Sequence, residues 1–354
     1  MVPQSPIGIL NSVYIQPSYL LATIYYHPTA VLVSILCSTV PETLESYIRE
    51  QNINNNNIMS SETASSICAN CGKEGSDVTN RCNKCKSVMY CNAACKKKHR
   101  KKHKKECERR VAELHDEKLF KQPPPKEDCS ICFLRLPTLG SDSTYMACCG
   151  KLICTGCVRA FRSKVTKRKD DICPFCRTPP PKSNEEFINM HEKRAEMNDA
   201  QAIQSLGAYY SHGMFGLQQD YTKALELWHR AADLGHADAY NRIGDAYAFG
   251  RGRMEINRKK AMYYFEQSAV RGDPAARCNL GEIEEEAGNT DRALKHYMIA
   301  VKDGNSASLE KIKSLHLEGR ATKDVYANAL RSYQVYVDEI KSDQRDEVIP
   351  RDPL

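Results

Sequence analysis

The chain has 354 residues, enough for two or three domains, and 17 cysteines, far more than an average intracellular protein carries. Its net charge of +7 is uneven. Residues 1–66 sum to −3 (one basic, four acidic), residues 67–182 to +15 (27 basic, 12 acidic) and residues 183–354 to −5 (23 basic, 28 acidic). This asymmetry indicates separate modules with separate partners. The chain shows no paired carboxylates, nucleotide-binding loop or nucleophile–histidine arrangement, which argues against an enzyme with bond chemistry of its own.

The first 41 residues contain no Asp, Glu, Lys or Arg. The stretch from Tyr19 to Val40 is apolar, but His27-Pro28 interrupts it and no Lys or Arg flanks it, as a membrane span would require. We therefore expect residues 1–66 to form a low-charge, disordered N-terminal segment. Two alternatives stay open: a membrane span, and a translation start at Met59 that would leave residues 1–58 unmade.

Fifteen cysteines fall between Cys68 and Cys176, mainly as C-x-x-C pairs. This spacing suits two ligands on one metal ion, whereas a disulfide scaffold is the competing interpretation. No basic segment precedes an apolar one in the manner of a secretory signal, and disulfides are rare in reducing compartments. The sequence therefore predicts zinc sites in a cytoplasmic or nuclear protein.

The first set of eight candidate ligands runs Cys-x2-Cys-x10-Cys-x2-Cys-x5-Cys-x3-Cys-x7-His-x3-Cys, enough for two closed tetrahedral sites. With "YCNAAC", this order resembles the MYND zinc finger over about 40 residues. The resemblance implies one zinc on Cys68, Cys71, Cys91 and Cys95, and another on Cys82, Cys85, His103 and Cys107. We expect His99 not to be a ligand. The family usually has Trp after this histidine, whereas this chain has Arg100, a departure that affects the family's peptide-docking groove.

A basic run, Lys96–Lys105, crosses the end of this finger. It is typical either of a nucleic-acid contact or nuclear localisation patch, or of a solvated basic helix. No aromatic residue is interleaved to stack on bases, which favours the solvated helix.

After the linker "KQPPPKED", a second set of eight runs Cys-x2-Cys-x15-Cys-Cys-x4-Cys-x2-Cys-x15-Cys-x2-Cys. This set resembles an all-cysteine RING-type finger. The resemblance implies one zinc on Cys129, Cys132, Cys154 and Cys157, and another on Cys148, Cys149, Cys173 and Cys176. It also implies that Ile131, Pro174 and Arg177 contact a ubiquitin-conjugating enzyme. Lys151 stands where RING domains usually have His, so the second site depends on two adjacent cysteines, or is completed by water.

From about residue 183 the cysteines give way to a helical period. Leu206-Gly207 recurs as Ile243-Gly244 and as Leu280-Gly281, each 37 residues on, and Gly235 recurs as Gly272 and Gly304. A period in the thirties with small residues at set places indicates stacked helix–turn–helix units. The pattern resembles Sel-1-like repeats of the tetratricopeptide class, which implies a protein-binding surface. We expect the following aromatic residues to fill its core: Tyr209, Trp228, Tyr247, Tyr264 and Tyr297.

The predicted fold class is two small zinc-stabilised α+β fingers followed by an all-α helical-hairpin solenoid. The expected parts are the N-terminal segment (1–66), the MYND-type finger (67–108), a helical, proline-rich linker (109–127), the RING-like finger (128–182), the repeats (183–341) and a tail (342–354). The predicted function is a protein-interaction adaptor holding up to four Zn²⁺, acting as a RING-type ubiquitin ligase. The alternative is a non-enzymatic or transcription-related scaffold that binds proteins or nucleic acid.

Overall fold

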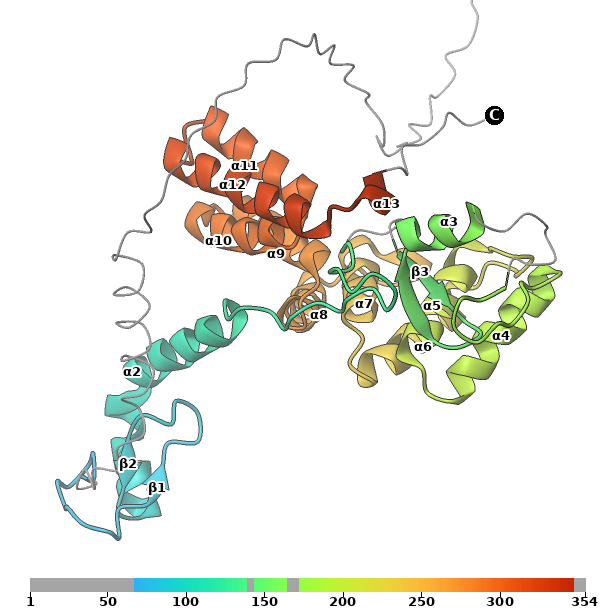
Figure 1. The fold of residues 1–354 in the computed structure, drawn as a ribbon. Helices are drawn as coiled ribbons and strands as arrows, with labels where there is room; N and C mark the ends of the chain where they lie inside the picture. Colours follow the sequence, from blue (N-terminus) through green and yellow to red (C-terminus); the bar gives the residue numbers. More distant parts are fainter. Residues whose placement is uncertain (1–66, 139–142, 164–171, 347–354) are drawn as a thin grey trace, which may run out of the picture. The chain divides into compact units, whose positions relative to one another are not determined.

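The computed structural model describes residues 67–138, 143–163 and 172–346 (Figure 1). The chain divides into the unit Met1–Ala64 and the unit Ser65–Leu354, and everything below concerns the second unit. The predictions for residues 1–66, including the span Tyr19–Val40 and the start at Met59, lie outside the described residues, as does the end of the tail. Within the described ranges no helix is both long and apolar enough to cross a membrane.

The first finger consists of a hairpin and the start of a long helix. Strands β1 (Asn80–Arg81) and β2 (Met89–Tyr90) pair antiparallel, and helix α2 (Ala93–Leu119) follows. The Asn92 side chain caps α2 by accepting a hydrogen bond from the backbone N–H of Cys95 at 2.8 Å. Helix α2 continues through most of the segment expected to be a linker and ends four residues before Pro123.

The second finger has strands β3 (Ser143–Met146) and β4 (Lys151–Cys154), paired antiparallel, followed by helix α3 (Thr155–Ser163). Its core contains Leu136 and Ile153 beside the cysteines. Like the first finger, it has too few buried apolar side chains to be stable without a further cross-link, which bound metal would supply.

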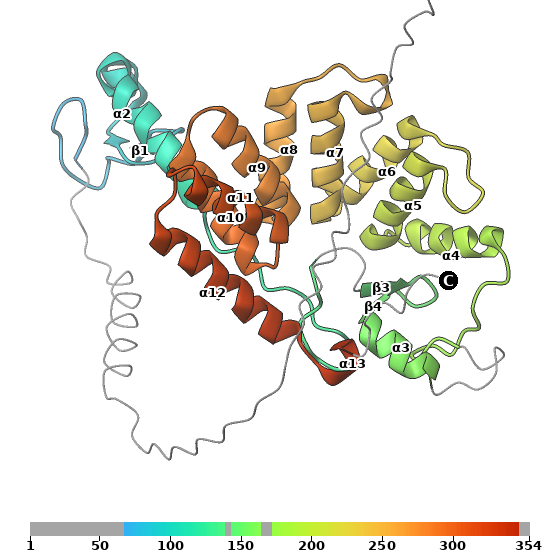
Figure 2. The ribbon, with the colours of Figure 1, turned by 90° about the horizontal axis from the view of Figure 1, so that it is seen from above.

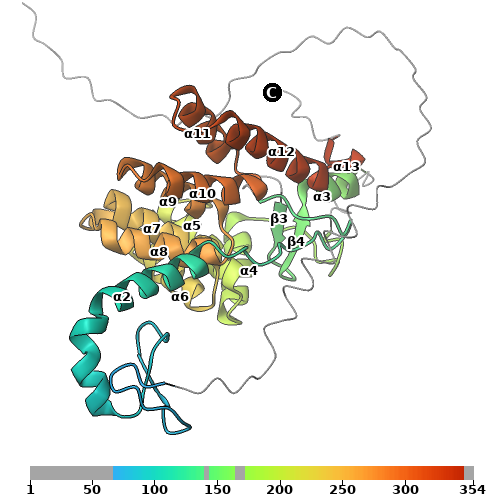
Figure 3. The same ribbon diagram turned by 90° about the vertical axis from the view of Figure 1, so that its left-hand side faces the viewer.

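The repeat region is a series of antiparallel helix pairs, preceded by one extra helix, α4 (Asn184–Glu196). Figure 2 shows α7 and α8 side by side, and Figure 3 shows the pairs that follow them. The remaining helices are α5 (Ala200–His212), α6 (Tyr221–Asp233), α7 (Ala237–Phe249), the short 3-10 helix η2 (Arg251–Arg253), α8 (Arg258–Val270), α9 (Pro274–Glu286), α10 (Thr290–Lys302), α11 (Ser306–Leu317), α12 (Lys323–Ile340) and α13 (Asp343–Asp346).

The recurring glycines explain how each pair packs. A Cβ atom at Gly207 would lie 2.5 Å from the Trp228 ring, one at Gly244 would lie 2.6 Å from Phe265, and one at Gly281 would lie 2.3 Å from Tyr297. In each pair an aromatic ring of the second helix therefore packs directly on the backbone of the first. This contact explains why glycine recurs at these positions of the repeat.

The expected core aromatics divide into two groups. Trp228 and Tyr297 are buried, whereas Tyr209, Tyr247 and Tyr264 are half-buried against the cores. The position of Trp228 and Tyr297 in the intervening repeat is taken by Phe265, the neighbour of Tyr264, and Phe265 is 2% exposed.

Candidate metal centres

The structure brings all sixteen predicted ligands together as four quartets. Within each quartet the ligand atoms all lie within 4.8 Å of one another. The quartets interleave along the chain, because the first and third pairs of each finger meet, and so do the second and fourth. They are Cys68, Cys71, Cys91 and Cys95; Cys82, Cys85, His103 and Cys107; Cys129, Cys132, Cys154 and Cys157; and Cys148, Cys149, Cys173 and Cys176.

The sulfur–sulfur distances fit a tetrahedral zinc ion. A Zn–S bond of about 2.3 Å gives a tetrahedron edge of about 3.8 Å. The Sγ atoms of Cys82 and Cys107 are 3.7 Å apart, those of Cys132 and Cys154 3.9 Å, and those of Cys149 and Cys173 3.7 Å. A disulfide needs about 2.05 Å. The described cysteines are all free thiols, so the geometry supports the metal interpretation over the disulfide one.

Four of the five C-x-x-C pairs form the same tight turn; in the fifth, Cys154 and Cys157, the second cysteine lies in helix α3. The residue after the second cysteine has a positive φ, and its N–H donates to the carbonyl of the first cysteine, as from Arg177 to Cys173 at 3.0 Å. Only one of these four positions is a glycine, so their positive φ could not be predicted from residue type. They are Gly72 (φ 72°), Lys86 (φ 59°), Phe133 (φ 57°) and Arg177 (φ 58°).

These turns favour the thiolate form that a metal requires. Burial alone raises the pKa of the Cys68 thiol, but backbone N–H groups of Cys91, Asn70 and Cys71 outweigh it and bring the pKa to about 6. Burial and backbone N–H groups oppose each other at Cys129 in the same way, and its pKa falls to about 7. Cys68 and Cys129 are thus prepared for coordination.

For other cysteines of the quartets, the neighbouring thiols and burial disfavour the thiolate form. Contact with Cys95, with burial and the nearby Cys68 and Cys71, raises the pKa of Cys91 to about 12. Burial and then Cys82 and Cys85 raise the pKa of Cys107 to about 11. The three or four sulfur atoms of a quartet cannot all ionise at these separations without a cation between them, and a divalent ion supplies the missing charge.

The adjacent pair Cys148 and Cys149 belongs to one quartet, and Lys151 does not. The tight turn before β4 allows this, because Gly150 has φ +74°. A Cβ atom at Gly150 would also meet the Arg194 side chain of α4. Lys151 is exposed at the start of β4, so the structure completes this site with cysteine rather than with the histidine usual in RING domains.

The residues predicted to contact a conjugating enzyme lie on the turns of the second finger. Ile131 is 36% exposed, Arg177 is exposed and Pro174 is half-buried. Phe133, two residues after Ile131, is 78% exposed, an apolar residue that sequence reasoning did not single out. In the first finger, His99 lies outside the quartets: its Nδ1 is 3.2 Å from the Tyr90 hydroxyl and its ring stacks on His103.

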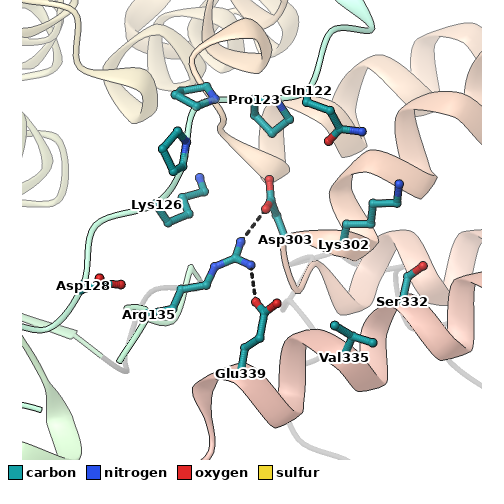
Figure 4. A pocket seen from close by; sticks show the side chains of 12 residues that line it. Gln122, Pro123, Lys126, Asp128, Arg135, Lys302, Asp303, Ser332, Val335 and Glu339 are labelled. Atoms are coloured by element: carbon teal, nitrogen blue, oxygen red, sulfur yellow. Dashed lines mark hydrogen bonds and ion pairs between the residues drawn. The ribbon is translucent and has the colours of Figure 1, made fainter. Parts of the chain in front are cut away.

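Polar contacts attach the second finger to the repeats. The Tyr145 hydroxyl donates to the Asp199 carboxylate at 2.7 Å, at the start of α5. Arg135 forms ion pairs with Asp303 at 2.6 Å and with Glu339 at 2.7 Å (Figure 4). These ion pairs border a cavity of about 510 Å³ between the proline-rich linker and α12.

Helix α13 adds a third attachment. The Arg345 guanidinium donates to the carbonyl of Arg135 at 2.8 Å and lies 3.6 Å from the sulfur of Cys132. Arg345 belongs to the segment expected to be a tail. This segment has no hydrophobic or repeat period, so the sequence could not predict the contact.

Two parts of the chain match family models. Residues 68–107 match the MYND finger, and residues 200–236 and 237–273 each match the Sel1 repeat. The chain thus combines a MYND zinc finger with Sel1 repeats. The matched residues do not include the second finger.

The chain is also similar to parts of three curated proteins. ERAD-associated E3 ubiquitin-protein ligase component HRD3B of Arabidopsis thaliana is 30% identical over 112 residues, 32% of this chain and 17% of that protein. The component HRD3A of the same plant is 34% identical over 68 residues, 19% of this chain and 10% of that protein. Chitin synthase regulatory factor 4 of Schizosaccharomyces pombe is 25% identical over 123 residues, 35% of this chain and 19% of that protein. The chain therefore spans less than a fifth of the length of each.

Solved structures with Sel1-type repeats resemble part of the chain. A Sel1 repeat protein from Oxalobacter formigenes has a TM-score of 0.38 and 28% identity, covering 44% of this chain and 62% of that one. The antigen c5321 of uropathogenic Escherichia coli has a TM-score of 0.36 and 25% identity, covering 44% and 33%. At these scores the repeat fold rests on the helix pairs and glycine contacts described above.

Proposed function

We propose that the chain is a zinc-binding adaptor whose repeats recruit partner proteins and whose second finger is a RING-type ubiquitin-ligase module. The MYND finger and the Sel1 repeats, both protein-interaction modules, support the adaptor part. The observation that carries the ligase part is the interleaved pair of quartets in the second finger, with Ile131 and Arg177 exposed on two of its turns.

In this proposal the zinc ions are structural. Four protein ligands leave no open position for a reacting water, so each ion holds its turn in place. The finger then acts by positioning: it orients a ubiquitin-loaded conjugating enzyme so that the thioester is attacked readily. Ile131 and Pro174 supply apolar contacts, and the planar guanidinium of Arg177 donates hydrogen bonds to both the enzyme and ubiquitin.

The setting of the protein is part of the proposal. Fifteen ligand cysteines must stay reduced to bind metal, so we place the chain in the reducing cytoplasm or nucleus. The names of two relatives describe components of ubiquitin ligases, which is compatible with repeats that serve ubiquitination. Because the matched segments cover at most 112 residues, the ligase activity needs a direct test.

The test is discharge of ubiquitin from loaded conjugating enzymes by the zinc-loaded chain, over a panel of such enzymes. Arg177→Ala and Ile131→Ala should each slow discharge by about tenfold or more, because each removes a contact worth about 1.5 kcal/mol or more. The matched controls are Arg81→Ala and Ile67→Ala, the same changes at exposed positions of the first finger, and they should leave the rate unchanged. No discharge with any enzyme in the panel, from protein that holds its zinc, would contradict the ligase part.

A non-enzymatic scaffold is the second candidate, and the attachment of the second finger favours it. Tyr145 and the Arg135 side chain contact the repeats, and the Arg135 carbonyl contacts α13. A finger used as a brace needs such contacts, whereas a ligase module needs only its exposed turns. Under this alternative, Tyr145→Phe lowers the stability of the finger while the panel of conjugating enzymes gives no discharge.

A further inference from the structure

A groove of about 760 Å³ lies in the first finger, between the β1–β2 hairpin and α2. Six cationic side chains line it and only one carboxylate does, that of Glu108. The cations are Lys84, Lys96, Lys97, Arg100, Lys101 and Lys104. Five of them come from α2, where positions 97, 100, 101 and 104 share one face of the helix.

Most of this charge has no partner within the described part of the chain. Lys96 is occupied, because its Nζ donates to the carbonyl of Arg81 and to the side chain of Asn83, each at 2.8 Å. The other five cations form no ion pair with any described residue. Two other carboxylates of the first finger already have partners: Asp77 pairs with Lys73 at 3.1 Å and Glu106 with Arg109 at 2.5 Å.

We propose that this groove binds an acidic peptide segment of a partner protein, a proposal that rests on the adaptor role above and names the partner's chemistry. Carboxylates along the peptide would pair with cations that the chain itself leaves unpaired. Arg100 stands where the resembled family usually has Trp, and it lines the groove. A guanidinium at that position is suited to a carboxylate rather than to an apolar side chain.

A nucleic acid fits the groove less well. The only Phe, Tyr or Trp in residues 67–108 is Tyr90, which is 1% exposed, so no ring is available to stack on a base. Phosphate contacts alone would also use the lysines of α2 outside the groove, such as Lys98, Lys102 and Lys105, equally well.

The lysines of α2 that lie outside the groove provide a matched control for those that line it. From Ala93 to Glu108 the helix rises about 22 Å, the length of about seven extended residues, so labelled heptaglutamate is a fitting probe. Its binding to the full zinc-loaded chain is followed by fluorescence anisotropy, with labelled heptaglutamine as the uncharged control. One triple variant carries Lys97→Gln, Lys101→Gln and Lys104→Gln, inside the groove; the other carries Lys98→Gln, Lys102→Gln and Lys105→Gln, outside it.

Both triple variants lose the same charge and flank the same ligand, His103. The groove variant should weaken heptaglutamate binding by about tenfold or more, as expected for the loss of three exposed ion pairs, while the outside variant changes it less than about threefold. Lys84→Gln lies outside α2 and should weaken binding by about two- to fivefold without disturbing the helix.

Equal losses in the two triple variants would overturn the proposal, because they would show attraction to the total charge of α2. An oligothymidylate of the same charge that binds as tightly as heptaglutamate would overturn it as well. No conjugating enzyme enters this measurement, so it fails or succeeds separately from ubiquitin discharge. Zinc content, measured for every variant, shows that the fingers compared are equally loaded.

Discussion

At the residue scale, the least expected feature is a pair of buried basic residues, an arginine and a histidine, in the repeats. Arg277 is 1% exposed and His296 is fully buried, and none of their side-chain nitrogens has a hydrogen-bond partner among the described residues. Burial brings the pKa of Arg277 down to about 10. Sequence reasoning did not single out either residue, because a lone Arg or His at a helical position is usually exposed.

His296 makes stability depend on pH. Burial first, then Arg277 and Arg292, lower its pKa to about 3, while Asp116 opposes them. A histidine in the unfolded chain has a pKa of about 6.5. As pH falls below that value, the unfolded chain binds a proton that the folded protein does not bind. Titration of His296 therefore does not affect the free energy of unfolding above about pH 6.5. As pH falls toward the folded pKa, the free energy of unfolding decreases, and the loss reaches about 2 kcal/mol by pH 5.

The measurement compares wild type with His296→Gln by urea unfolding at about pH 7 and about pH 5. We expect the wild type to lose about 2 kcal/mol more unfolding free energy than the variant between about pH 7 and about pH 5. Comparing a difference cancels the release of zinc by acid, which is common to both. A difference that stays constant with pH would contradict the assignment.

At the element scale, the sequence predicted the helix pairs well and their packing less completely. The Gly-containing period identified α5 to α10, because it records an aromatic ring on a glycine backbone. It led to Tyr264 rather than Phe265 as a core residue, since two adjacent aromatics on a helix cannot be ranked by burial from period alone. Helix α4 and the part of α2 in the linker do not recur at the repeat period. The sequence pattern therefore could not predict how they pack.

The glycine contact predicts a substitution with an unusual sign. Replacing Gly by Ala inside a helix normally stabilises it by about 1 kcal/mol. At Gly244 the new methyl group would lie 2.6 Å from the Phe265 ring, so Gly244→Ala should instead destabilise the repeats by about 1 to 3 kcal/mol. Urea unfolding followed by far-UV circular dichroism measures this.

A double-mutant cycle separates the contact from other effects. In the Phe265→Leu background the smaller side chain leaves room, so the cost of Gly244→Ala should fall by more than half. An unchanged cost in that background would show that the ring is not what excludes the methyl group.

At the scale of the whole molecule, spacing was enough to identify the sixteen candidate ligands, and the resemblances were needed to sort them into quartets. The structure brings together those same quartets, including Cys148 with Cys149. The sequence could not show that the second finger is tied to both ends of the repeats, through Tyr145 and Asp199 at one end and Arg135 and Glu339 at the other. Those contacts join residues far apart in the chain and follow no spacing rule.

The central claim is that four metal centres hold two consecutive fingers ahead of a repeat domain. Native mass spectrometry of the purified zinc-loaded chain tests this most directly, with Cys71→Ser and Cys176→Ser as variants that each remove one ligand from a different finger. The account predicts four bound zinc ions in the wild type and weakened retention of one ion in each variant. A wild-type chain that binds three ions or fewer, while its cysteines are reduced, would contradict it.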